Sequence, residues 1–157
     1  MSIENNNIPL TACFSFIKQQ HYLFLNKVLE DEEINAGQSA FLIYLLFNNR
    51  ACQDDIANHY KIGKGSVARG IRKLEDLNLI SKETDENNRR KCILTLNKDG
   101  ERIAKKILEA NKKWEEEIYS QVDIPKENLE DIMKQVAIKT MEINKKINME
   151  GFDGSGK

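Results

Sequence analysis

The sequence is poor in the residues that build disulfide frameworks, metal centres and catalytic sites. It has three cysteines without a CxxC pair and only two histidines in 157 residues. An odd number of widely spaced cysteines argues against a disulfide scaffold or a zinc site. The sequence also lacks a glycine-rich phosphate loop and a nucleophile motif, so an enzyme is the least favoured class. It therefore predicts no metal, no cofactor and no catalytic residue.

Long apolar runs are missing as well. The longest, residues 41–47, has seven residues, whereas a membrane-spanning helix needs about 20. The first residues, Met-Ser-Ile-Glu-Asn-Asn-Asn, show no basic stretch followed by an apolar one, which argues against a secretory signal. With 40% hydrophobic and 31% charged residues, the composition is typical of a soluble globular chain. We expect a cytoplasmic protein that does not contact a membrane.

The charges nearly balance but are unevenly distributed. There are 24 basic and 25 acidic residues, for a net charge of −1. Residues 61–74 contain five basic residues and no acidic one, and residues 89–91 are Arg-Arg-Lys, which leaves 16 basic against 25 acidic residues elsewhere. Such segregation lets a nearly neutral protein present a local positive surface to phosphate. Two solvated basic stretches without a function are the alternative.

Hydrophobic periodicity predicts the elements of the first half of the chain. Residues 10–29 are rich in apolar residues on one helical face, so a largely buried first helix is expected. Asn35 and Gln38 have the spacing of a capping box that opens a second helix, apolar on nearly all sides, which ends at Phe47.

Two short helices and a hairpin are expected next. The helices cover residues 53–60 and 64–77, and the second has an apolar stripe formed by Val67, Ile71 and Leu74. Residues 79–84 and 91–96 have the pattern of two strands, joined by turn-prone residues.

The last part of the chain is predicted to be two long helices. Asn97 is expected to cap a helix that reaches about Gln121, and Pro125 suits the first turn of the final helix. The final helix carries a narrow apolar stripe over five turns: Leu129, Met133, Val136, Thr140, Ile143 and Ile147.

The order of helix, tight turn, basic helix and two-stranded ribbon is that of a winged helix-turn-helix. A DNA major groove about 12 Å wide admits one helix, and Lys64-Gly65-Ser66 allows its close approach. Arg69 is suited to the paired acceptors of guanine or to a phosphate, and the hairpin tip suits an adjacent minor groove. The predicted DNA-binding residues are Lys64, Gly65, Ser66, Ala68, Arg69, Arg72, Lys73, Arg89, Arg90 and Lys91. A winged helix that binds protein partners, with these cations only solubilising it, is the alternative.

At these residues the chain resembles the MarR-type transcriptional regulators, over roughly residues 10–148. The resemblance is carried by residues 53–57, 67–75, 79–80 and the segment 85–100, which ends in Leu-Thr-Leu-Asn-Lys-Asp-Gly. The family's wing has a D-x-R-D-x-R-like signature. Here Asp85 and Arg90 match it, whereas Asn87 and Asn88 stand where Arg and Asp are usual, and Arg89 is a second candidate for the minor groove.

The resemblance implies a fold that is mainly α with a small β-hairpin wing (α+β), in which N- and C-terminal dimerisation helices flank the winged helix-turn-helix. Residues 1–34 with 98–150 would form the dimerisation region, 35–97 the DNA-binding domain and 151–157 a disordered tail. It also implies a homodimeric repressor. The stripe of the final helix supports a dimer independently, because such a stripe needs a partner surface; packing on this chain's own first helix competes with it. A symmetric dimer predicts a pseudo-palindromic operator on double-stranded DNA.

Two further features follow from the resemblance. Members of the family bind small aromatic or organic anions between the dimerisation region and the winged helix, and the candidates here are His21, Tyr22, Phe24, Tyr44 and Arg50; the alternative is a place in the core. A reactive cysteine occurs in the first helix of one branch, but the residues around Cys13 differ from that pattern, which favours a buried structural thiol. Cys52 stands at a helix start beside two acidic residues, which oppose a thiolate.

Overall fold

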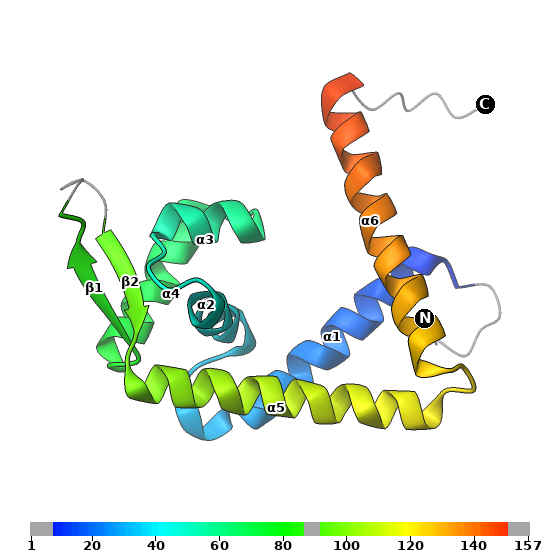
Figure 1. Ribbon diagram of the computed structural model, residues 1–157, viewed down its shortest axis with the longest axis horizontal. Coiled ribbons are helices and arrows are strands. Elements are labelled where there is room, and N and C mark those ends of the chain that lie inside the picture. Colours follow the sequence, from blue (N-terminus) through cyan, green and yellow to red (C-terminus); the bar gives the residue numbers. More distant parts are fainter. Residues whose placement is uncertain (1–7, 87–91, 151–157) are drawn as a thin grey trace. The chain divides into compact units, whose positions relative to one another are not determined.

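The computed structural model describes residues 8–86 and 92–150, which form helices and one antiparallel hairpin (Figure 1). The chain divides into two compact units, residues 1–112 and 113–157. In chain order the elements are α1 (Leu10–Val28), the 3-10 turn η1 (Glu30–Glu32), α2 (Ala36–Phe47), α3 (Gln53–Tyr60), α4 (Lys64–Asp76), β1 (Ile80–Thr84), β2 (Cys92–Leu96), α5 (Lys98–Gln121) and α6 (Lys126–Glu150). The predicted class, mainly α with a small hairpin, is confirmed.

Helix α2 begins at the predicted capping box. The Asn35 side chain accepts a hydrogen bond from the Gln38 backbone N–H at 3.0 Å, and the Gln38 side chain accepts one from the Asn35 N–H, also at 3.0 Å. The two bonds satisfy donors that a helix start would otherwise leave unpaired. Leu42 and Leu45 of this helix, which was expected to be apolar on nearly all sides, are buried in the core.

The prediction that α1 is largely buried is wrong. Leu25 is its one buried residue among those described, and Leu10, Ile17 and Leu23 remain exposed. The reason is that hydrophobic periodicity shows which face of a helix is apolar, but not how much of that face the core covers. The core of residues 1–112 receives Leu25 and, half-buried, Phe24, whereas Leu10, Ile17 and Leu23 are left uncovered.

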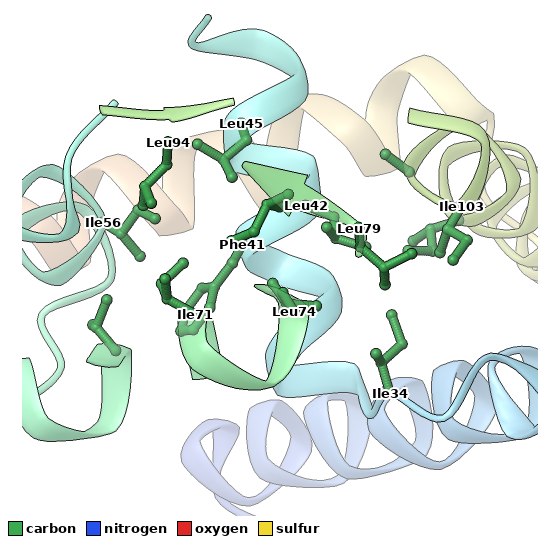
Figure 2. Packing of buried hydrophobic residues seen from close by; sticks show 14 of the residues in the cluster. Ile34, Phe41, Leu42, Leu45, Ile56, Ile71, Leu74, Leu79, Leu94 and Ile103 are labelled. Atoms are coloured by element: carbon green, nitrogen blue, oxygen red, sulfur yellow. The ribbon is translucent and has the colours of Figure 1, made fainter. Parts of the chain in front are cut away.

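One hydrophobic core holds the elements of residues 1–112 together. Side chains from α2, α3, α4, β2 and α5 converge in it, among them Leu45, Ile56, Ile71, Leu94 and Ile103 (Figure 2). In α4 the predicted stripe of Val67, Ile71 and Leu74 is fully buried. The core fixes α4 by this stripe, so the opposite side of α4 faces outward.

An ionic contact ties the corner between α1 and α2 to helix α5. Glu32, in η1, accepts hydrogen bonds from Arg102 at 3.2 Å and from Lys106 at 2.9 Å. The Glu32 side chain is only 12% exposed. The hydrogen bonds from Arg102 and then Lys106 lower the pKa of Glu32 below its ordinary value.

Residues 113–157 contain the end of α5 and the whole of α6. Near the turn between them, the Tyr119 hydroxyl donates to Glu130 at 3.2 Å, and the Lys126 ammonium lies 4.9 Å from the centre of the Tyr119 ring. Pro125 directly precedes α6, and its carbonyl accepts from Asn128 and Leu129. Several apolar side chains of α6 remain exposed, including Ile132, Met133 and Ile143.

None of the helices in the described ranges has the length and apolar content that a membrane crossing needs. The predicted tail, residues 151–157, lies outside the described residues. The predicted division into a dimerisation region and a DNA-binding domain remains a prediction.

Candidate nucleic-acid interface

Helices α3 and α4 are joined by a three-residue turn that aims the start of α4 outward. Lys61 ends α3 in the left-handed backbone region with φ 54°, and Gly63 precedes the first residue of α4. The backbone N–H of Ile62 donates to the Ala57 carbonyl at 3.2 Å, which closes the end of α3. The turn and both helices match the bounds that were expected from sequence, with α4 one residue shorter at its end.

The described residues predicted to bind DNA all lie on the outer side of α4. They are exposed, whereas the residues between them that belong to the apolar stripe are buried; the exposed set is Lys64, Gly65, Ser66, Ala68, Arg69, Arg72 and Lys73. The wing cations Arg89, Arg90 and Lys91 lie outside the described residues. Helix α4 therefore presents four cations on one surface, which we call the basic face (Lys64, Arg69, Arg72 and Lys73).

Two contacts hold side chains at the N-terminal end of the basic face. The Lys64 ammonium lies 2.8 Å from a carboxylate oxygen of Asp54, in the first turn of α3. The hydrogen bond to Asp54 and its charge raise the pKa of Lys64. The Arg69 guanidinium donates to the Ser66 hydroxyl at 3.2 Å, a neutral partner. The Asp54 contact joins two elements and was not expected from the sequence.

A glycine sets the distance between α4 and α2. A Cβ added at Gly70 would lie 2.5 Å from Cε2 of Phe41, closer than such atoms approach in proteins. Gly70 therefore lets the Phe41 ring lie against the backbone of α4.

The hairpin extends from the same core. Strands β1 and β2 are antiparallel with Ile80 opposite Leu96 and Thr84 opposite Cys92. Leu94 also pairs with Ala51, whose carbonyl accepts from the Leu94 N–H at 2.8 Å, so the segment before α3 borders the hairpin. This pairing anchors the base of the wing beside the helix-turn-helix.

A polar junction that sequence reasoning missed joins the end of α4, the hairpin and the start of α5. The Asn97 side chain donates to the backbone and side-chain oxygens of Asn78, each at 3.1 Å, and accepts from the Ser81 hydroxyl. The Asn97 carbonyl also accepts from Glu101, so Asn97 stands at the helix start as expected. Its position before a helix indicated a cap; the contact with Asn78 depends on a fold that brings distant residues together.

A pocket of about 530 Å³ lies beside the N-terminal half of α4. Its lining includes Lys18 of α1, Phe41 of α2, Tyr60 of α3, and Ser66 and Arg69 of α4. Two cations and two aromatic rings thus face one space, and the described residues that line it include no carboxylate. Such a pocket suits a small organic anion with an apolar body.

The five residues predicted to bind an effector lie elsewhere. His21 contacts Asn111 at 2.9 Å, and its ring is 6.2 Å from that of Phe24, on the same helix. Tyr44 packs its ring 4.9 Å from His59, while Tyr22 and Arg50 are exposed. The structure does not place these five among the residues that line the pocket beside α4. Their role as ligand contacts remains a prediction.

The three thiols are free and half-buried. Cys52 precedes α3, where its backbone N–H donates to the Asp55 carboxylate at 2.8 Å. Across residues 8–86 and 92–150, no three histidine, cysteine or acidic side chains gather as metal ligands would.

Comparisons with known proteins agree on one family. Residues 34–92 match the MarR family. The sequence is 26% identical over 106 residues to the HTH-type transcriptional regulator BilQ of Clostridium symbiosum (strain WAL-14163), which covers 68% of this chain and 74% of the relative.

Solved structures share the fold over most of the chain. A crystal structure of MarR is 26% identical, with a TM-score of 0.81 and coverage of 92% of this chain and 99% of that one. A complex of S. aureus MepR with DNA is 22% identical, with a TM-score of 0.76 and coverage of 87% and 98%. A MarR transcriptional regulator from Methanosarcina mazei Go1 is 23% identical, with a TM-score of 0.78 and coverage of 85% and 97%.

Proposed function

We propose that the chain is a MarR-family transcriptional regulator, a homodimeric repressor that reads a pseudo-palindromic DNA operator. In this proposal α4 enters the major groove, the wing with Arg89, Arg90 and Lys91 enters the minor groove, and the protein works without a cofactor. The basic face carries the proposal, because its cations are exposed on the side of α4 opposite a fully buried stripe. The structure of S. aureus MepR with DNA, which shares the fold, supports it.

The roles of the α4 residues follow from their order along the helix. Lys64, Gly65 and Ser66 stand at the N-terminal end, where small and polar residues permit close approach to base edges. Ala68 and Arg69 follow on the exposed side, and an arginine there matches the paired acceptors of guanine. Arg72 and Lys73 lie farther from the tip, so they suit phosphate contacts that set orientation.

Duplex binding tests the proposal directly. Arg69→Ala combined with Arg90→Ala should abolish binding to a random-sequence duplex at low salt, and the wild type should lose affinity steeply as salt rises. Lys134→Ala with Lys145→Ala is the matched control: it removes two charges from exposed positions of α6 that lie off the apolar stripe. A folded wild-type dimer that binds no duplex would instead favour a winged-helix module for protein partners.

The dimer would set the spacing of the operator. Two recognition helices about 34 Å apart contact two half-sites separated by one turn of DNA. Selection from a randomised pool should therefore enrich an inverted repeat. A hydroxyl-radical footprint confined to a single half-site would contradict this arrangement.

The pocket beside α4 is the best-supported site for an effector in this proposal. A small aromatic carboxylate would place its ring near Phe41 and Tyr60 and its charge near Lys18 and Arg69. Because Arg69 also belongs to the basic face, the bound anion would draw that side chain away from DNA. Benzoate, used as the probe, should release the duplex, and Lys18→Gln should weaken that release without changing duplex affinity in the absence of benzoate.

A further inference from the structure

The contact between Asp54 and Lys64 distinguishes Lys64 from the other cations of the basic face. Among the described residues, Lys64 is the one member of that face with an ion pair, and Arg69 instead bonds a neutral hydroxyl. The paired side chains are 54% and 78% exposed, so they meet at the protein surface and not in the core. An acidic group therefore stands at the tip of the helix that, in the proposed function, approaches DNA first.

We propose that Asp54 is a specificity-determining residue, which withholds Lys64 from the phosphates of DNA of arbitrary sequence. The inference rests on the proposed function, because it concerns how the same surface distinguishes an operator from other DNA. Sequence-independent affinity comes almost entirely from cations that neutralise phosphates. A protein in which a carboxylate of the same chain pairs with one of these cations has less of that sequence-independent affinity.

Asp54 acts on non-specific binding in two ways. A phosphate can pair with Lys64 only if it replaces the carboxylate 2.8 Å away, so the two anions compete for one ammonium. The displaced carboxylate also repels the phosphate, because two negative charges beside the same ammonium lie within the Debye length and are only partly screened. At the operator, the base contacts of the other α4 residues supply affinity that does not depend on Lys64 reaching a phosphate.

A purely structural role does not account for this carboxylate. The cap of α3 is made by the neighbouring Asp55, which accepts from the Cys52 N–H at 2.8 Å. Exposed ion pairs contribute little to stability. Asp54 also lies in the first turn of α3, where an acidic residue favours the helix dipole, so a small stability effect is expected from its loss.

The test compares duplex affinity over a range of salt concentrations. Asp54→Asn should bind a random-sequence duplex roughly two- to fivefold more tightly at low salt, in line with the strength of exposed ion pairs. Its salt dependence should steepen by about 0.9 in the log–log slope, since one more phosphate is neutralised. Affinity for the selected operator should rise less, so the ratio of operator to random affinity falls.

Three variants isolate the cause. Glu30→Gln removes the same charge from the ion pair with Lys27, in which the Glu30 side chain is 53% exposed. It should leave the random-sequence affinity and the salt slope unchanged. Asp54→Glu keeps the charge and should behave as the wild type. In a Lys64→Ala background, Asp54→Asn should no longer change the salt slope, because the ammonium that it releases is gone.

The outcomes separate this inference from the proposed function. If the wild type binds no duplex, the proposed function fails, and this inference with it. A second outcome is that the wild type binds duplex and that Asp54→Asn has the same affinity for random-sequence duplex and the same salt slope. If a thermal unfolding transition shows that the variant is folded, this result overturns only the present inference. An equal gain for Glu30→Gln would overturn it too, because net charge and not the contact with Lys64 would be the cause.

Discussion

At the scale of single residues, backbone approach decides which positions accept a side chain. Gly100, in the first turn of α5, lies so close to the residue before β1 that an added Cβ would be 2.0 Å from the Leu79 carbonyl oxygen. An added Cβ at Gly65 would meet only the end of the Arg69 side chain, at 3.6 Å. The two glycines have different roles. Gly100 permits the backbone of α5 to pack against Leu79, whereas Gly65 leaves the N-terminal end of α4 without a side chain at that position.

Gly100→Ala should destabilise the protein by about 1–3 kcal/mol, because the backbone that it meets cannot move aside as a side chain can. The loss exceeds the helix-propensity gain of about 1 kcal/mol for alanine over glycine. Gly65→Ala is the matched substitution and should leave stability unchanged or slightly raised. Urea denaturation of both variants checks this, and equal stability of the Gly100 variant and the wild type would contradict the packing argument.

At the scale of elements, ionic and polar contacts join segments that the core alone does not align. Glu32 holds the corner before α2 against α5 through Arg102 and Lys106. Asn97 holds the start of α5 against Asn78 at the end of α4. The Asn97 contact links the long helix to the end of α4, the helix that carries the basic face, and the Glu32 contact links it to the corner before α2.

The Glu32 contact predicts a pH-dependent stability. Its pKa is lowered in the folded protein, chiefly by the hydrogen bond from Arg102, so the contact stabilises the fold above the ordinary value of 4.5. That stabilisation is lost as the pH falls through the folded-state pKa. Glu32→Gln should cost on the order of 0.5–1 kcal/mol at neutral pH, as expected for ionic contacts with access to water.

Urea denaturation of the wild type and Glu32→Gln at neutral pH and at a pH well below 4.5 checks the sign. The difference between the two proteins should shrink toward the acidic condition. A difference that stays constant with pH would show that the charge of Glu32 is not the cause.

At the scale of the whole molecule, the apolar stripe of α6 is only partly covered within a single chain. Met133 and Ile143 of the stripe are 41% and 55% exposed, and Ile132 beside it is 51% exposed. Apolar surface of this extent along one helix is typical of an interface. The proposed dimer would cover it with a second copy of the chain.

Ile143→Asp should therefore raise the dissociation constant of the dimer by at least tenfold, since it puts a charge into an apolar interface. Operator affinity should fall with it, because a monomer contacts one half-site. Asn144→Asp adds the same charge one residue away, off the stripe, and should have little effect. Sedimentation equilibrium measures the dimer directly, and an unchanged dimer in the Ile143 variant would place the interface elsewhere.

Much of the fold and of the basic face could be predicted because those features are local. A capping box joins residues three apart, and an apolar stripe repeats along one helix. The cap at Asn35 and the burial of Val67 could therefore be predicted from nearby residues in the sequence. The exposed positions of α4 followed from the same periodicity. Helix α1 was the exception, because periodicity indicates an apolar face but not how much of that face the core covers.

The tertiary structure alone decided the contacts between distant segments. The partners of Asp54, Glu32 and Asn97, and the pocket that combines Lys18 with Arg69, depend on how helices pack against each other. Side-chain patterns specify which face of an element is buried, but not which charged group on a neighbouring element lies opposite. The sequence by itself determined the elements and the cations that they expose; packing determined which of those cations an acidic neighbour holds.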